Sequence, residues 1–190
     1  VQFDWQPEYA GWLAHRRADF VAFSYYRSAV VNASKIPAKT PVNRYLAHSF
    51  EDNDFVPQTE WGWTIDPLGL RNVITKLYDQ YQVPVFPVEN GIGIHEIWDG
   101  KHQIDDTARI DYHRAHIQAM QAAMFEDGAE VLGYLGWGLI DIPSSHADME
   151  KRYGAVYVNR GNHDLRDLRR VPKKSFYWFQ QVFGSNGEDL

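Results

Sequence analysis

The sequence contains no cysteine among its 190 residues. Disulfide frameworks and thiolate metal sites both need cysteine, so neither describes this protein. No apolar stretch approaches the roughly 18 residues that cross a bilayer, so we expect no membrane partner. Positive charge is also scarce: 19 Lys and Arg against 25 Asp and Glu give a net charge of −6. Without a basic patch interleaved with aromatic residues, we expect no nucleic-acid partner.

The eight histidines form no convincing set of metal ligands, and we expect neither a metal nor an organic cofactor. Aromatic residues, in contrast, make up 15% of the chain. Their faces suit the packing of a protein core and the stacking of sugar rings equally well, so composition alone does not choose between these uses.

Segments typical of strands and helices alternate along the chain. Residues 20–23, 85–88 and 131–136 suit buried strands, and residues 67–81, 107–127 and 173–183 repeat apolar residues at helical spacing. Residues 153–159 predict part of a hairpin, and the aperiodic residues 32–57 predict a long loop. Asp66 and Asp106 are the expected helix caps. In the first of these helices Leu70, Ile74, Leu77 and Tyr81 recur at helical spacing. In the last, the expected core face is formed by Phe176, Phe179 and Phe183.

Strands that alternate with helices predict parallel β-α units and therefore an α/β fold. The most informative residue is Glu89, which follows a buried strand and precedes the turn residues Asn90 and Gly91. A carboxylate at the C-terminal end of a parallel strand lies where α/β barrels keep their catalytic groups. A solvated acid before a turn is the alternative interpretation.

The segment Val-Phe-Pro-Val-Glu-Asn-Gly at residues 85–91 resembles the nucleophile segment of the family 1 glycoside hydrolases, which are retaining β-glycosidases. Further segments resemble the same family in order along nearly the whole chain. They are residues 19–26, 60–71, 105–112, 133–141, 151–154 and 173–178. The resemblance implies the C-terminal part of a (β/α)8 barrel, about strands six to eight, with residues 1–190 as a single partial domain. A closed barrel of this type needs eight strands.

The resemblance also implies roles for residues. Glu89 would be the nucleophile, Tyr26 would hydrogen-bond to it, and Trp137 would form the floor of the sugar site, although core packing also explains a tryptophan there. Retaining glycosidases need a second carboxyl group about 5–5.5 Å away as acid/base. In the family it lies in an Asn-Glu-Pro segment, which this sequence does not contain. The chain therefore carries half of the catalytic pair.

The spacing of Ser144, Lys151 and Tyr153 resembles the phosphate-binding motif of the 6-phospho-β-glycosidases. The Glu-Trp pair that ordinary β-glucosidases carry after this strand is absent. A lysine and two hydroxyl groups suit a phosphate dianion, which a glutamate would repel. A solvated Lys-Arg pair before a hairpin is the alternative. Ser145 is small, as in the enzymes of this family that act on glucosides, where the galactoside enzymes tend to carry tryptophan.

The predicted function is that of a 6-phospho-β-glucosidase, with a phosphorylated β-glucoside or disaccharide as substrate and the cytoplasm as its location. Trp61 and Trp63 are expected on the leaving-group side of the site, although one of them fits the core equally well. A 6-phospho-β-galactosidase, or an enzyme with both activities, is the first alternative. A non-catalytic module that binds sugar phosphates is the second. We expect the isolated chain to be inactive and to associate with itself or with the missing N-terminal half of its barrel.

Overall fold

The computed structural model describes residues 4–51 and 53–190. Its centre is a layer of parallel extended segments. Strand β1 (Val21–Ser24) pairs in parallel with strand β4 (Val85–Glu89) through Val21 and Val85. Residues 131–136 lie along the other edge of β4, with parallel bridges from Val85 to Val131 and from Asn90 to Gly136. The order across the layer is therefore β1, β4 and then residues 131–136, as three successive barrel strands require.

The predicted strand at residues 131–136 forms separate bridges to β4 without a continuous ladder. Leu132 N donates to Val85 O at 3.0 Å, but the next bond comes from Leu135 N to Pro87 O at 3.1 Å. Pro87 has no N–H to donate at this point, so the regular alternation of parallel bonds breaks. The segment still follows β4 to its C-terminal end.

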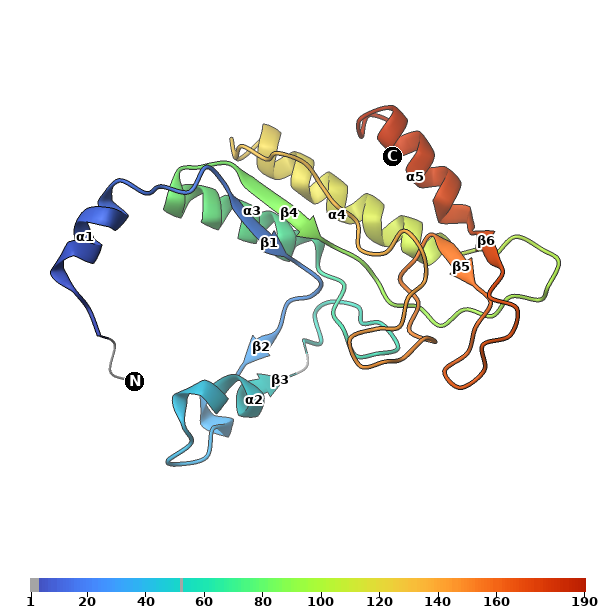
Figure 1. The fold of residues 1–190 in the computed structure, drawn as a ribbon, viewed down its shortest axis with the longest axis horizontal. Coiled ribbons are helices and arrows are strands. Elements are labelled where there is room, and N and C mark those ends of the chain that lie inside the picture. Colours follow the sequence, from blue (N-terminus) through green and yellow to red (C-terminus); the bar gives the residue numbers. More distant parts are fainter. Residues whose placement is uncertain (1–3, 52) are drawn as a thin grey trace.

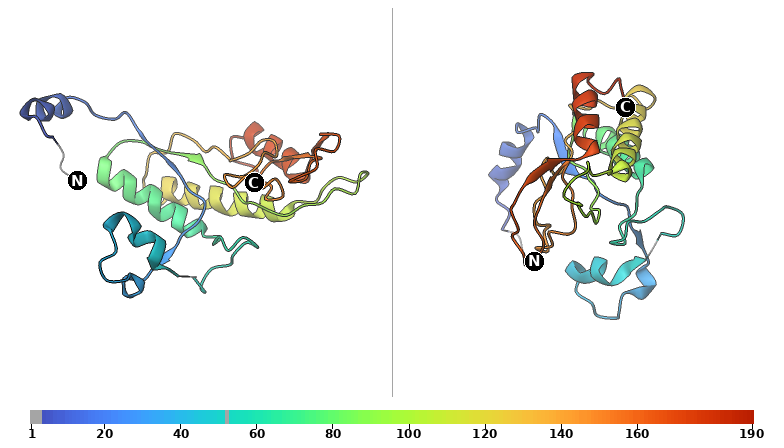
Figure 2. Two further views of the ribbon diagram at one scale, coloured as in Figure 1. Left: turned by 60° about the horizontal axis from the view of Figure 1, so that its bottom comes forward. Right: turned by 90° about the vertical axis from the view of Figure 1, so that its right-hand side faces the viewer.

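Helices α3 (Pro67–Tyr81), α4 (Thr107–Phe125) and α5 (Lys174–Gly184) lie side by side against one face of this layer (Figures 1 and 2). Helix α3 has the predicted bounds, and the Asp66 side chain accepts from Gly69 N at 2.9 Å, as expected for an N-cap. The fully buried core between α3, α4 and the strands includes Leu70, Ile74, Val85, Ile117 and Ala123.

Two details of the predicted helices differ in the structure. Asp106 is the N-cap residue of α4, as predicted, but its side chain makes no capping hydrogen bond; the carboxylate instead accepts from Arg109 Nε at 2.9 Å and from Ser175 N at 2.8 Å. The buried face of α5 contains Trp178 and Val182, whereas Phe183 is 61% exposed. Phe179, from the middle of the predicted face, is half-buried and lies edge to face with His113 of α4, with 4.9 Å between ring centroids.

Smaller elements surround this layer. Helix α1 (Pro7–Ala14) stands apart from the body and buries none of its residues (Figure 1). The predicted loop at 32–57 contains the turns η1 (Ala33–Lys35) and η2 (Val42–Arg44) and helix α2 (Tyr45–Ser49). It is closed by strands β2 (Val30–Val31) and β3 (Phe50–Glu51), which pair antiparallel.

The predicted hairpin is present, and it is formed by β5 (Val156–Val158) and β6 (Arg170–Pro172). Within residues 4–51 and 53–190, no helix is both long and apolar enough to cross a membrane.

Candidate active site

Glu89 and Tyr26 meet at the C-terminal ends of β4 and β1. The Tyr26 hydroxyl donates to Glu89 Oε2 at 3.0 Å, and Tyr25 N donates to Glu89 O at 2.8 Å. A shift in register between Phe23 and Ser24 sets these strand ends opposite each other. Burial and the hydrogen bond to Glu89 raise the pKa of Tyr26. The phenol therefore remains protonated and can donate to the carboxylate at neutral pH.

Asn90 fixes the strand ends around this pair. Its side chain is fully buried, and Nδ2 donates to Tyr25 O at 2.7 Å and to the Tyr112 hydroxyl at 3.1 Å. Its Oδ1 accepts from the Tyr134 hydroxyl at 2.6 Å, and Tyr112 in turn donates to Tyr26 O at 3.2 Å. Asn90 thus joins β1, α4 and residues 131–136. The sequence predicts it only as a turn residue, because these partners are 22 to 65 positions away in sequence.

Trp137 lies at the corresponding end of the third extended segment. Its backbone N–H donates to Asn90 O at 2.7 Å, and the residue is 37% exposed. It lines an open apolar groove with Phe176 and Phe179 of α5. The structure therefore places Trp137 one strand away from Glu89.

Trp61 and Trp63 approach the pair from the loop before α3. Thr59 Oγ1 accepts from Trp61 N at 3.3 Å and from Trp63 N at 3.2 Å, which shapes this loop. The rings of Tyr26 and Trp63 lie edge to face, with 5.7 Å between their centroids. Trp63 therefore contacts the residue that holds Glu89.

Lys151 and Tyr153 reach the same aromatic cluster. Lys151 Nζ lies 3.7 Å from the Trp63 ring centroid, and the rings of Tyr153 and Tyr26 are 6.2 Å apart. A Cβ at Gly93 would lie 2.7 Å from Lys151 Cγ, so a larger residue there would displace the lysine side chain from its present path across this loop. Burial lowers the pKa of Lys151 and raises the pKa of Tyr153 to about 12. At neutral pH a neutral phenol donor thus faces the site beside the Lys151 side chain.

Ser144 and Ser145 do not join this cluster. The Ser144 hydroxyl accepts from Asp148 N at 3.3 Å, and Ser144 N donates to Asp148 O at 2.9 Å. These bonds close a turn, and in the described part of the chain Ser144 makes no hydrogen bond to Lys151. Ser145 is exposed, with its hydroxyl 3.3 Å from His146 Nδ1. Their contact with a phosphate remains a prediction.

A further cation, Arg27, lies at the cluster and was not among the predicted site residues. Its guanidinium carbon is 5.0 Å from the Trp63 ring centroid. The available signal was its position directly after Tyr26, at the end of a barrel strand.

A buried network of charged residues lies on the side of the Lys151–Tyr153 segment that faces away from the site. Arg152 Nη1 and Lys173 Nζ each lie 3.0 Å from a carboxylate oxygen of Asp141. Lys173 also pairs with Glu96, whose other oxygen lies 2.7 Å from Arg109 Nη2. Successive side chains of an extended segment point to opposite sides, so Arg152 faces this network while its neighbours face the site. Removing one partner would leave buried charges uncompensated.

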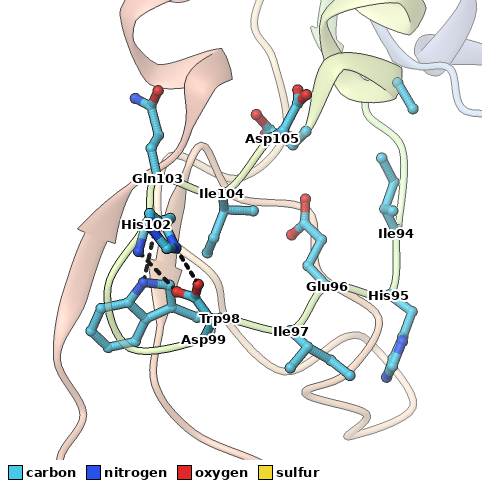
Figure 3. Close-up of a pocket in the computed structure, with 12 residues that line it drawn as sticks. Ile94, His95, Glu96, Ile97, Trp98, Asp99, His102, Gln103, Ile104 and Asp105 are labelled. Atoms are coloured by element: carbon cyan, nitrogen blue, oxygen red, sulfur yellow. Dashed lines mark hydrogen bonds and ion pairs between the residues drawn. The ribbon is translucent and has the colours of Figure 1, made fainter.

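Figure 3 shows a separate cavity under the loop at residues 94–106. Glu96 lines it but is paired with Arg109 and Lys173, and Asp99 is paired with His102 at 2.5 Å. The cavity therefore offers no free carboxylate pair, and we assign the site to the strand ends. Among the described residues, no three His, Asp or Glu side chains gather as a metal ion would require.

The chain matches a known protein family along nearly its whole length. The family model described as "Glycosyl hydrolase family 1" matches residues 8–188. The chain belongs to glycosyl hydrolase family 1. The solved structure of the family 1 β-glucosidase from Thermotoga maritima superimposes with a TM-score of 0.76 and 31% identity, over 90% of this chain and 36% of that one. This family 1 chain is therefore a partial α/β barrel.

The curated relatives of this family 1 chain include phosphoglucosidases. It is 44% identical over 177 residues to the 6-phospho-beta-glucosidase AscB of Escherichia coli (strain K12), covering 90% of this chain and 36% of that protein. It is 39% identical over 181 residues to the aryl-phospho-beta-D-glucosidase BglA of Bacillus subtilis (strain 168), covering 94% and 38%. The chain thus spans well under half of the length of these relatives.

Proposed function

We propose that this chain is the C-terminal part of a retaining glycoside hydrolase that acts on 6-phospho-β-glucosides. The observation that carries the proposal is the position of Lys151. Its ammonium group lies 3.7 Å from the ring centroid of Trp63, and Trp63 contacts Tyr26, the hydrogen-bond partner of Glu89. A cation close to a nucleophilic carboxylate suits an anionic sugar.

In the proposed reaction, a Glu89 oxygen attacks the anomeric carbon of the substrate while the bond from that carbon to the leaving-group oxygen breaks. The product of this step is a glycosyl ester on Glu89, and water then cleaves it to regenerate the carboxylate. The Tyr26 hydroxyl orients Glu89 and supports its anionic form. The leaving group needs a proton from an acid/base residue, and the family's Asn-Glu-Pro segment for that residue is absent from this sequence.

We therefore infer that the chain works with the preceding strands of a barrel. Substrate specificity for glucosides over galactosides rests on Ser145, a small exposed residue. The alternative has some support, because the chain is 39% identical over 133 residues to a 6-phospho-beta-galactosidase from Leptotrichia buccalis, covering 68% of this chain and 27% of that protein. A comparison of kcat/KM for the two phosphoglycosides decides between them. We place the reaction in the cytoplasm, in carbohydrate metabolism.

The test uses the complete enzyme, meaning the protein in which this segment is joined to the preceding strands of its barrel. The Lys151→Gln variant is assayed on 4-nitrophenyl β-glucoside with and without a 6-phosphate. We expect kcat/KM for the phosphorylated substrate to fall by about one to two decades, because a charge-assisted contact contributes roughly 1.5–3 kcal/mol. The unphosphorylated substrate should be little affected.

The matched control is Lys76→Gln, which removes an exposed lysine from α3. It should leave both substrates unchanged. Equal losses on both substrates in Lys151→Gln would mean that Lys151 is structural. A complete enzyme that prefers the unphosphorylated glucoside would contradict the proposed substrate. Phosphosugar binding without turnover by the complete enzyme would favour the non-catalytic module.

A further inference from the structure

Arg27 and Lys151 share one aromatic platform although they are 124 positions apart in sequence. The Arg27 guanidinium carbon lies 5.0 Å from the Trp63 ring centroid, and Lys151 Nζ lies 3.7 Å from the same point. Lys151 Nζ also lies 5.8 Å from the ring centroid of Tyr153. Two cations and a phenol therefore gather beside the Tyr26–Glu89 pair.

The charge of one carboxylate, Asp148, acts on Lys151 without forming an ion pair with it. Within residues 4–51 and 53–190, Arg27 and Lys151 form no ion pair, whereas Lys35, Arg71, Arg109 and Lys173 all do. The positive charge of Arg27 also affects the pKa values of two neighbouring residues. It lowers the pKa of Lys151, in addition to the larger effect of burial, and opposes the burial that raises the pKa of Tyr153. Like charges repel each other, and an anion bound by both cations would offset that repulsion.

We propose that Arg27 is a second cationic ligand of the substrate phosphate, acting together with Lys151. The proposal rests on the proposed function, since it assigns a further specificity-determining residue to the same 6-phosphate. A phosphate monoester carries close to two negative charges at pH 7. The planar guanidinium can offer two parallel N–H donors to phosphate oxygens, whereas the lysine ammonium acts as a point charge. The pair thus matches a dianion in charge.

Arg27 could instead have a structural role, and the two roles lead to different expected results. Stacked on Trp63, its guanidinium could simply hold that indole in place through a cation–π contact. In that role, loss of the charge would disturb the binding of phosphorylated and unphosphorylated sugars alike. As a phosphate ligand, it affects only the phosphorylated ones.

The experiment compares the complete enzyme with Arg27→Gln, Lys151→Gln and the double variant. The probes are glucose 6-phosphate and glucose, each measured as a competitive inhibitor of the hydrolysis of a chromogenic 6-phospho-β-glucoside. We expect Arg27→Gln to weaken inhibition by glucose 6-phosphate roughly tenfold and to leave inhibition by glucose within about twofold. Arg27→Lys should recover part of the loss, because it restores the charge without the planar donor pair.

Arg44→Gln, which removes an exposed arginine from η2, is the matched control and should leave both inhibition constants unchanged. In the double variant, the preference for glucose 6-phosphate over glucose should fall below that of either single variant. The inference is overturned if Arg27→Gln changes neither constant or changes both equally while Lys151→Gln still lowers the preference. If Lys151→Gln also leaves the preference intact, the proposed function itself fails.

Discussion

At the scale of single residues, the main feature of the site is the hydrogen bond from Tyr26 to Glu89. Its length of 3.0 Å fits a phenol that donates to a carboxylate. Burial and the adjacent carboxylate raise the pKa of Tyr26, so the donor does not ionise in the physiological range. The bond therefore both supports the anion and restricts the rotation of the Glu89 side chain.

Replacing Tyr26 by phenylalanine in the complete enzyme should lower kcat/KM for a 6-phospho-β-glucoside by about one to two decades. The reason is the loss of one hydrogen bond to a charged group, which contributes roughly 1.5–3 kcal/mol. Steady-state kinetics measures the effect, and Tyr78→Phe on α3 is the matched control for loss of a tyrosine hydroxyl. An unchanged kcat/KM in Tyr26→Phe would remove this tyrosine from the reaction.

Some residues of the site could be predicted from the sequence and others could not. Glu89 and Lys151 stand out in the sequence because a strand end and a motif spacing are local features. Asn90 and Arg27 do not, because their partners come from distant segments: Tyr134 for one, and Lys151 with Trp63 for the other. The three residues predicted to bind phosphate do not all come together, since the hydroxyl of Ser144 accepts a hydrogen bond within its own turn.

At the scale of elements, helix α4 carries two buried histidines against the strands. His116 Nδ1 donates to Tyr112 O at 2.7 Å, and its ring stacks on Tyr112 with 4.0 Å between centroids. Its Nε2 is buried without a hydrogen-bond partner in the described residues. Burial lowers the pKa of His116 to about 4, and it places the pKa of His113 well below its ordinary value. The folded protein thus keeps both rings neutral.

This helix should therefore make stability depend on pH. Between about pH 6.5 and pH 4 the unfolded chain binds a proton at His116 that the folded protein does not bind, so stability is complete above this range and falls as the pH decreases through it. The expected loss from His116 alone between pH 7 and pH 5 is about 2 kcal/mol.

Urea unfolding of the complete enzyme and of His116→Leu at both pH values measures this contribution. The variant should lose less stability than the parent on acidification. Parallel losses in the two proteins would show that His116 is not the titrating group.

Helix α3 provides a test of local structure. Asp66→Ala should destabilise the protein by about 1 kcal/mol, because the Gly69 N–H loses its acceptor. Gly69→Ala should lower the stability of the protein further, since the added Cβ would lie 2.1 Å from the Tyr25 hydroxyl, which donates to Asp66 O. Thermal unfolding measures both, with Asp79→Ala in the last turns of the same helix as the control. An unchanged unfolding temperature in Gly69→Ala would mean that the Tyr25 side chain can shift to make room for the added Cβ.

The bounds of α3 could be predicted because its cap and its apolar spacing are encoded locally. The burial of α5 could not, because the helix has apolar residues on two sides and sequence does not say which side meets α4. Of the phenylalanines expected in the core, Phe179 packs against it from one side, whereas Phe183 is exposed. All three, including Phe176, line the groove beside Trp137. The interrupted strand at residues 131–136 depended on Pro87 in the neighbouring strand.

At the scale of the whole molecule, the layer ends in open edges. Strand β1 pairs only on its β4 side within the described residues, and the outer side of residues 132–142 exposes Leu135, Leu139 and Ile142 by 49%, 67% and 45%. The groove along α5 adds the exposed Phe183. Unpaired strands and contiguous apolar surface favour association with another chain.

The purified 190-residue chain should therefore have a mass in solution above its own 22.0 kDa, rising with concentration. Light scattering after size exclusion measures it. Joining the chain to the preceding strands of its barrel should shift the protein toward a single species, because the same surfaces become buried. A strictly monomeric isolated chain that also hydrolyses a 6-phospho-β-glucoside would mean that an acid/base lies within these residues. The exposed Glu60 would be the first carboxylate to test, since Asp141 is buried and paired with Arg152 and Lys173.

The most direct test is to trap the covalent intermediate in the complete enzyme. A 2-deoxy-2-fluoro-β-glucoside 6-phosphate with a good leaving group should form the glycosyl ester and hydrolyse slowly, so that peptide mass spectrometry can locate the sugar. We predict one labelled residue, Glu89, and much slower labelling by the same reagent without its phosphate. Label on another residue, no label at all, or equally fast labelling by both reagents would contradict the account.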